Sequence, residues 1–182
     1  MSQSVGSLLV ECGHHPGKCD DSGMMSQSLL LDAIDKSLLR HVQQDATLSI
    51  EQLAERVNLS RNACWRRLKR LEDEGIIRAR VALADPVKLN LELTVFIAVR
   101  TSRHDADWAT RFHQAVQDIP ELLGVYRTAG DIDYILHARV PNVAAYDRLY
   151  KKLTARIEMQ DVSASFVMEE IKEVTALPLD FV

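Results

Sequence analysis

The stretch from residue 49 to residue 75 constrains the fold most, because it sets two short helices at a fixed spacing. Ser49, with Gln52 three residues later, has the capping-box spacing that begins a helix, and Ser60 begins the next one. Asn58 between them suits a tight turn because Asn tolerates left-handed dihedrals, and Gly75 ends the second helix. Two short helices joined in this way predict a helix-turn-helix.

A further helix is expected just before this pair, over residues 32–44. Its apolar stripe consists of Ile34, Leu38, Leu39 and Val42. After the pair, residues 76–83 have the pattern of a short hairpin. Three helices and a hairpin predict a winged helix-turn-helix domain over residues 29–84, followed by a linker over residues 85–92.

The second helix of the pair has one apolar and one basic face. Cys64, Leu68 and Leu71 fall at i, i+4 and i+7 and are expected to face the core. Residues 61–70 hold five positive charges and no negative one, and a helix N-terminus itself favours anions. The side chains predicted to contact DNA phosphates and base edges are Ser60, Arg61, Asn62, Trp65, Arg66, Lys69 and Arg70.

Charge is distributed unevenly along the chain. The net charge of −4 is unusual for a protein that binds nucleic acid, but residues 32–84 carry ten Lys or Arg against eight Asp or Glu. A solvated face remains the alternative for Arg66 and Arg70, which can pair with acidic residues at 72–74. An intramolecular salt bridge competes with DNA contact for Arg67, and core packing competes for Trp65.

A second domain is expected over residues 93–182. The predicted order is strand 93–101, helix 105–118, strand 121–129, strand 132–140, helix 142–157 and strand 161–170. This βαββαβ order predicts a ferredoxin-like domain, so the chain as a whole is of the α+β class. The first strand has apolar residues on both faces, and a sheet face without helices to cover it predicts pairing into dimers.

Five motifs in order resemble the Lrp/AsnC (feast/famine) family of regulators. They are Leu31-Asp32-x-Ile34-Asp35, Leu53-Ala54-x-x-Val57-x-Leu59-Ser60, Cys64-x-x-Arg67-Leu68-x-x-Leu71-Glu72-x-x-Gly75-Ile76-Ile77, Gly130-Asp131-Ile132-Asp133-Tyr134 and Met168-Glu169-Glu170-Ile171-Lys172. The resemblance covers residues 29–178. It implies a DNA-binding transcriptional regulator whose C-terminal domains pair as homodimers, assemble into octamers, and bind a small amino-acid effector that modulates DNA binding or assembly.

The resemblance also implies where the effector binds, in a pocket between dimers. The residues carried over to that pocket are Thr128, Ala129, Gly130, Asp131, Asp133 and Tyr134. The loop suits the task chemically, since glycine allows close backbone approach, backbone N–H groups can hold a carboxylate and an aspartate can hold an ammonium. The alternative is that the two aspartates bond only their own backbone, as turn aspartates commonly do.

Residues 163–169 and 175–178 resemble a branch of the family that controls cysteine degradation and sulfide release. Under that resemblance the effector would be cysteine or a related thiol amino acid, with Ser163 and Ser165 facing the pocket. Leucine or another amino acid is the alternative effector. The chain departs from better-known members at Asn62 and Trp65, so their DNA sequence preferences are not transferred.

Residues 1–28 have no helical or strand periodicity and are expected to be disordered. Within this segment Cys12, His14, His15 and Cys19 match no common zinc spacing, and no metal or cofactor is predicted. Three cysteines at unrelated spacings indicate a reducing compartment, and no apolar stretch is long enough to cross a bilayer. These features predict a cytoplasmic protein, with Cys64 as a buried small hydrophobe.

Two other functions compete with the regulator. An enzyme would need a nucleophile, a base and an orienting group at motif spacing, whereas His104, His113 and His137 are isolated and no phosphate-binding loop is present in the sequence. A nucleoid-architectural protein that wraps DNA without a ligand would use the same basic helix. Site preference over random DNA, and a response to an amino acid, distinguish the regulator from the architectural protein.

Overall fold

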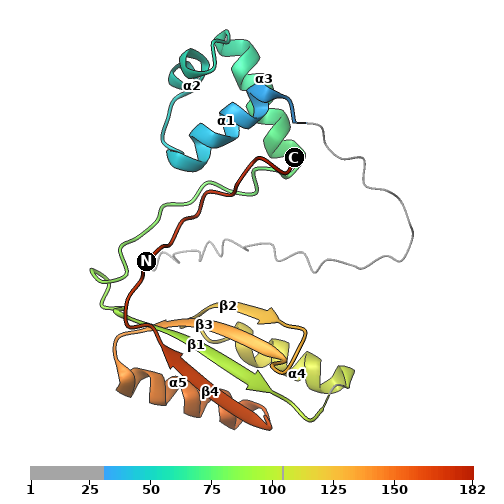
Figure 1. Ribbon diagram of the computed structural model, residues 1–182, viewed down its shortest axis with the longest axis vertical. Helices are drawn as coiled ribbons and strands as arrows, with labels where there is room; N and C mark the ends of the chain where they lie inside the picture. The colour runs from blue at the N-terminus through green and yellow to red at the C-terminus, as the bar shows by residue number, and fades with distance from the viewer. Residues whose placement is uncertain (1–30, 104) are drawn as a thin grey trace, which may run out of the picture.

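The computed structural model describes residues 31–103 and 105–182, which form a helical head and a sheet domain (Figure 1). The segment predicted to be disordered, with Cys12, His14, His15 and Cys19, lies outside the described residues, and so does His104. Among the described helices, none has both the length and the apolar character needed to cross a membrane.

The head consists of α1 (Ala33–Gln44), α2 (Ile50–Arg56) and α3 (Arg61–Asp73), as the sequence predicts. Ser49 and Gln52 form a capping box at the start of α2, and Ser60 caps α3. Asn58 and Gly75 take left-handed backbone conformations, with φ of 54° and 72°, at the turn and at the end of α3. The buried head core is made of Leu38, Val42, Leu48, Leu53, Ala54, Cys64 and Leu68.

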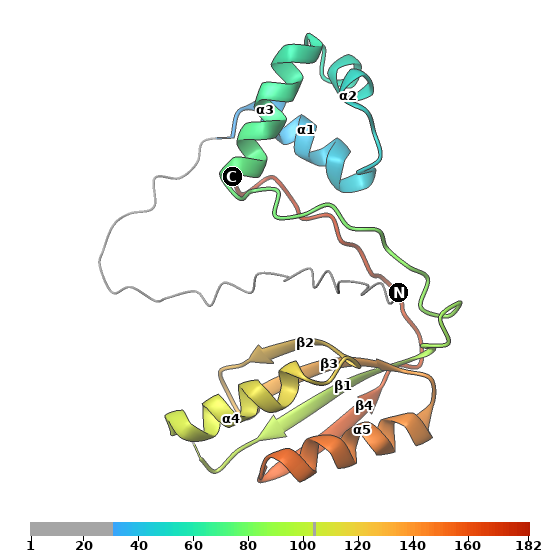
Figure 2. The ribbon, with the colours of Figure 1, turned by 180° about the vertical axis from the view of Figure 1, so that it is seen from behind.

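The hairpin predicted over residues 76–83 is not formed, and no strand is present in this segment. Ile77 packs on the head core, but Val81 and Leu83 are 72% and 74% exposed. A two-stranded hairpin is at best marginal unless one face packs on a core, and neither Val81 nor Leu83 belongs to the head core. The chain instead runs extended from the head to the sheet domain (Figures 1 and 2).

The sheet domain has the predicted βαββαβ order and the ferredoxin-like topology. Its elements are β1 (Leu93–Arg100), α4 (Ala106–Gln117), β2 (Leu122–Arg127), β3 (Tyr134–Val140), α5 (Val143–Arg156) and β4 (Asp161–Phe166). The strands lie in the order β2-β3-β1-β4, and every neighbouring pair is antiparallel. Both helices lie on one face of the sheet, as Figure 2 shows from the helix side.

The core of this domain lies between the sheet and its two helices. Alternate residues of β1, namely Val95, Ile97 and Val99, are at most 1% exposed beneath the helices. Trp108 and Phe112 of α4 stack with ring centroids 5.0 Å apart. The indole Nε1 of Trp108 donates a hydrogen bond to the backbone oxygen of Glu158 (2.8 Å), so the polar atom of this buried ring is satisfied.

The opposite face of the sheet has no helix over it, and we call it the bare face. Its central strands contribute Phe96 and His137, whose rings stack at 5.0 Å and lie directly opposite each other in the β1–β3 register. Tyr126 of β2 lies on the same face next to Ile135. Phe96 is 43% exposed, and burial, followed by the charge of nearby Arg139, lowers the pKa of His137. The bare face thus has an exposed aromatic and apolar centre that no helix of the chain covers.

Candidate functional site

The structure presents α3 as a helix with one buried and one exposed face. The buried face is formed by Cys64, Leu68 and Leu71, each at most 3% exposed. The predicted DNA-contacting residues that are exposed at the surface of the head are Ser60, Arg61, Asn62, Trp65, Arg66, Lys69 and Arg70. Trp65 is 54% exposed, so it is not a core residue within one chain. The helix therefore carries its polar and basic side chains where a DNA groove could receive them.

A buried carboxylate in α1 binds two of the arginines of α3. Asp35 is 1% exposed, and its Oδ1 lies 2.9 Å from Nη1 of Arg67 while its Oδ2 lies 2.5 Å from Nη2 of Arg70. Arg67 also reaches Asp32 at 2.6 Å. The intramolecular alternative is therefore confirmed for Arg67. Arg70 is paired with Asp35 as well, but its side chain is still 42% exposed, so its contact with DNA stays a prediction.

Two other cations of the exposed face form ion pairs at the surface. Arg61 lies 2.6 Å from Glu51, and Lys69 lies 2.6 Å from Asp73 one helical turn on. Exposed pairs of this kind contribute about 0–1 kcal/mol and are readily exchanged for a phosphate. Within the described part of the chain, Arg66 has no ion pair, so its guanidinium is the one most available to a ligand.

Hydrogen bonding and burial shift the pKa values of two groups around α3. The backbone N–H of Asp35 and then the side chain of Arg67 lower the pKa of Asp32, which keeps this capping carboxylate charged. Burial raises the pKa of the Cys64 thiol. A protonated, buried thiol is a poor nucleophile, which fits the prediction that Cys64 is a small core residue.

The predicted effector loop connects β2 to β3 and is held by its own hydrogen bonds. The backbone N–H of Thr128 donates to the carbonyl of Asp133 (2.9 Å), and the Thr128 hydroxyl donates to the carbonyl of Ile132. Gly130 has a φ of +125°, a conformation that favours glycine. The carboxylate of Asp133 accepts a hydrogen bond from the backbone N–H of Thr101 (2.8 Å), which ties the loop to the end of β1.

Within this loop, the exposed side of the chain is the one available to a ligand. Ala129, Gly130 and Asp131 are exposed, whereas Thr128 and Asp133 are half-buried and bonded to backbone groups. The carboxylate of Asp133 thus bonds the backbone of Thr101, which is not the backbone of its own turn, as the alternative had it. The side chain best placed to meet an ammonium group is that of Asp131.

Tyr134 lies in the core of the sheet domain and not on the exposed side of this loop. Its ring is 6% exposed and packs in the core, with its centroid 4.4 Å from that of Phe112 and 5.8 Å from that of Trp108. Tyr134 faces the helices because it pairs with Val99, a core residue of β1. The two serines lie elsewhere: Ser163 and Ser165 are exposed on the bare face, opposite Ala98 and Phe96 in the register of β1 and β4.

Comparison with known proteins places both halves of the chain in one family. Residues 94–177 match the Lrp/AsnC ligand binding domain, and residues 31–78 match a winged helix-turn-helix DNA-binding domain. The DNA-binding transcriptional activator DecR of Escherichia coli is 47% identical over 83% of this chain and 100% of its own. The chain belongs to the Lrp/AsnC family of transcriptional regulators.

Other members of the Lrp/AsnC family match over most of their length. The glutamate uptake regulatory protein of Zymomonas mobilis is 49% identical, covering 82% of this chain and 91% of its own. An AsnC family regulator from Agrobacterium tumefaciens has a TM-score of 0.81 at 48% identity, covering 83% and 99% of the two chains. A Neisseria meningitidis regulator, solved as a complex with L-Met, has a TM-score of 0.80 at 38% identity, covering 84% and 99%.

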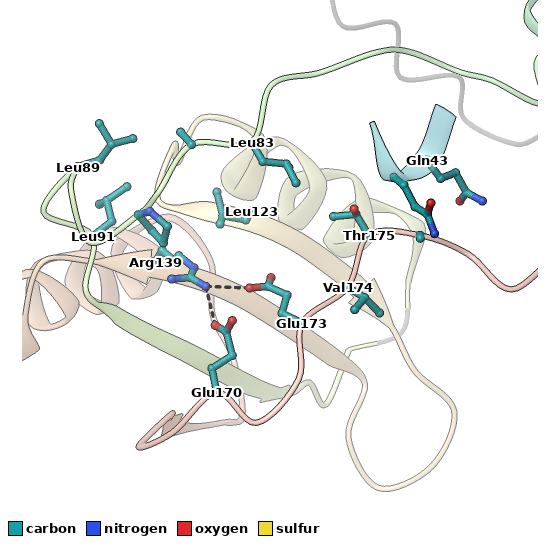
Figure 3. Close-up of a pocket in the computed structure, with 14 residues that line it drawn as sticks. Gln43, Leu83, Leu89, Leu91, Leu123, Arg139, Glu170, Glu173, Val174 and Thr175 are labelled. Atoms are coloured by element: carbon teal, nitrogen blue, oxygen red, sulfur yellow. Dashed lines mark hydrogen bonds and ion pairs between the residues drawn. The ribbon is translucent and has the colours of Figure 1, made fainter. Parts of the chain in front are cut away.

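This Lrp/AsnC protein also has a groove that the sequence did not indicate. It measures about 650 Å³ and lies between the head and the sheet domain (Figure 3). Gln43 of α1, Leu83 and Leu89 of the connecting segment, Arg139 of β3 and Thr175 of the segment after β4 line it. No residue of the loop 128–133 lines this groove, so the predicted effector loop and the groove are separate places.

Proposed function

We propose that this Lrp/AsnC regulator reads specific DNA sites through the exposed face of α3. The observation that carries the proposal is that the cations of α3 differ in their ion pairing. Arg67 and Arg70 bind the buried Asp35, while Arg66 is left without an ion pair among the described residues. Residues 29–84 then form the DNA-binding domain, 85–92 the linker and 93–182 the effector-binding and oligomerisation domain. Double-stranded DNA as the target implies a cytoplasmic protein.

The bare face supports homodimers. A copy of the chain placed against it by a two-fold axis would cover Phe96, Tyr126 and Ile135 on both partners at once. Dimers paired through the loops 128–133 would build an octamer and carry several heads. Paired heads then engage half-sites spaced by about 10 bp or a multiple of it.

The loop 128–133 is proposed to bind the carboxylate and ammonium groups of an amino acid between dimers. Support comes from the exposed Ala129 and Gly130 backbone and the exposed Asp131 carboxylate. Cysteine is the proposed effector; Ser163 and Ser165 lie on the bare face, so the loop 128–133 is proposed to bind it without them. An effector bound between dimers would change assembly or head spacing and so modulate DNA binding, a coupling of about 1–3 kcal/mol.

Replacing Arg66 with alanine should weaken binding to a selected operator by about 5-fold to 150-fold, since a lost arginine contact to base or phosphate costs about 1–3 kcal/mol. The oligomer should stay intact because Arg66 is exposed on the head. Fluorescence anisotropy with labelled duplex measures the affinity. Arg148→Ala on α5 is the matched control and should bind as the wild type does; equal affinities for all three proteins would remove α3 from the DNA interface.

Replacing Asp131 with alanine should abolish the response to the effector and leave DNA binding intact. A thermal-shift screen of the purified protein against amino acids gives the readout, because a ligand at a hundred times its dissociation constant stabilises by about 2.7 kcal/mol. A shift with cysteine alone supports cysteine, and a shift with leucine or methionine names another effector. A shift that persists in the Asp131→Ala protein would place the pocket elsewhere.

A further inference from the structure

The segment after β4 (residues 167–182), which we call the tail, leaves the sheet domain and returns to the head. It begins in register with the sheet, since the backbone N–H of Val167 donates to the carbonyl of Thr94 (3.0 Å). It then runs beside the connecting segment as far as the end of α3, as both views of the ribbon show (Figures 1 and 2). Two extended segments therefore join the head to the sheet domain.

One end of the tail is anchored to β3 by charge. Nη2 of Arg139 lies 2.9 Å from Oε2 of Glu170 and 3.2 Å from Oε2 of Glu173, and Figure 3 shows the two contacts. The Arg139 side chain is only 12% exposed. Glu170 and Glu173 are 48% and 56% exposed, so these pairs are partly screened by solvent, but Arg139 contacts two residues of the tail at once and links this part of the tail to the sheet domain.

The other end is anchored to α1 by backbone hydrogen bonds. The side-chain amide of Gln43 donates from Nε2 to the carbonyl of Leu177 (3.3 Å) and accepts at Oε1 from the N–H of Leu177 (2.7 Å). One glutamine thus satisfies both backbone groups of one tail residue, as a neighbouring strand would. Lys36, on the same helix, donates from Nζ to the carbonyl of Val182.

The helix that receives the tail is also the helix that holds α3. Asp35 lies next to Lys36 in α1 and binds Arg67 and Arg70. A displacement of α1 is therefore transmitted to α3. The connecting segment, residues 78–92, contains no strand and has an exposed Leu89. With that segment alone, the head would be tethered at one point and free to reorient.

We propose that the tail is a strap that fixes the head relative to the sheet domain, and that its release from Gln43 frees the head to reorient. Met168, Ile171 and Leu177 are 95%, 90% and 71% exposed, so the strap buries little apolar surface. Segments with few buried contacts open at the low end of the local stability range, which leaves the strap in balance between docked and released states. A docked strap would fix the position of the head for DNA binding, and this consequence rests on the proposed function.

Hydrogen–deuterium exchange of the full-length protein tests the strap without DNA. The Leu177 amide should exchange more slowly than its neighbours, and Gln43→Ala should raise its exchange rate by about fivefold, the contribution of one ordinary hydrogen bond. Gln44→Ala is the matched control, an exposed neighbour on α1, and should leave the rate unchanged. Arg139→Gln should also raise the exchange rate of the Leu177 amide, because the tail then loses its second attachment, to β3.

A Leu177 amide that exchanges at the free-chain rate in the wild type would overturn the strap, and so would equal effects of Gln43→Ala and Gln44→Ala. These outcomes leave the proposed DNA-binding function standing. Conversely, a protected Leu177 in a protein that binds no DNA would keep the strap and remove the proposed function. The exchange rate tests the strap and the DNA titration tests the proposed function, so either one can be refuted without the other.

Discussion

The double replacement Arg67→Ala and Arg70→Ala is expected to lower the free energy of unfolding of the head by about 3 kcal/mol. The reason is the burial of Asp35, which is 1% exposed and would be left charged with neither guanidinium beside it. A buried charge without a partner costs several times more than a surface ion pair contributes. Urea unfolding followed through the amide NMR signals of α1 and α3 measures the change.

A compensating replacement separates this explanation from simple loss of packing. Adding Asp35→Asn to the double variant removes the buried charge at nearly constant volume and should restore about half of the lost stability, because a neutral amide costs less to bury unpaired. Lys69→Ala is the control, since it deletes only an exposed pair with Asp73 and should change stability by less than about 0.5 kcal/mol. A triple variant no more stable than the double variant would contradict the buried-charge account.

Replacing Phe96 with aspartate should prevent the proposed homodimer from forming through the bare face. Phe96 lies in the middle of the bare face, stacked on His137, and is 43% exposed within one chain. A two-fold interface over this face would bury two unpaired carboxylates near each other, which costs at least about 3 kcal/mol, or more than 100-fold in the dimer dissociation constant. Sedimentation velocity gives the mass of the assembly.

Val143→Asp is the control for this experiment. Val143 is 61% exposed at the first position of α5, in the helix layer away from the bare face, and an acidic residue there suits the helix N-terminus. This variant should assemble as the wild type does. A Phe96→Asp protein that keeps the wild-type mass would show that the subunits pair through another surface.

The helices of the head could be predicted from the sequence because their boundaries are set locally. Ser49, Gln52 and Ser60 cap within three residues of themselves, and Asn58 needs only its own left-handed conformation. The prediction of a hairpin at residues 76–83 was wrong because the alternation of apolar and polar residues does not reveal whether a strand pair has a surface to pack on. The order of elements in the sheet domain was predicted correctly because its two helices and four strands show their apolar periodicity over longer stretches.

The features of the site that the sequence did not reveal are contacts between residues distant in sequence. Arg70 is paired with Asp35, which lies 35 residues earlier in α1. Tyr134 follows the effector loop directly, and only its pairing with Val99 decides that it faces the helices. The anchors of the tail span still larger separations, with 134 residues between Gln43 and Leu177. Periodicity and spacing contain no information on such pairs.

Selection of DNA from a random pool by the full-length protein tests the central claim most directly, that the exposed face of α3 reads sequence. We expect enrichment of one sequence with two related half-sites about 10 bp or a multiple of it apart, and loss of that enrichment in the Arg66→Ala protein. DNA recovered with no sequence preference, held only by a salt-dependent affinity for phosphate, would contradict it and favour a protein that wraps DNA without reading it.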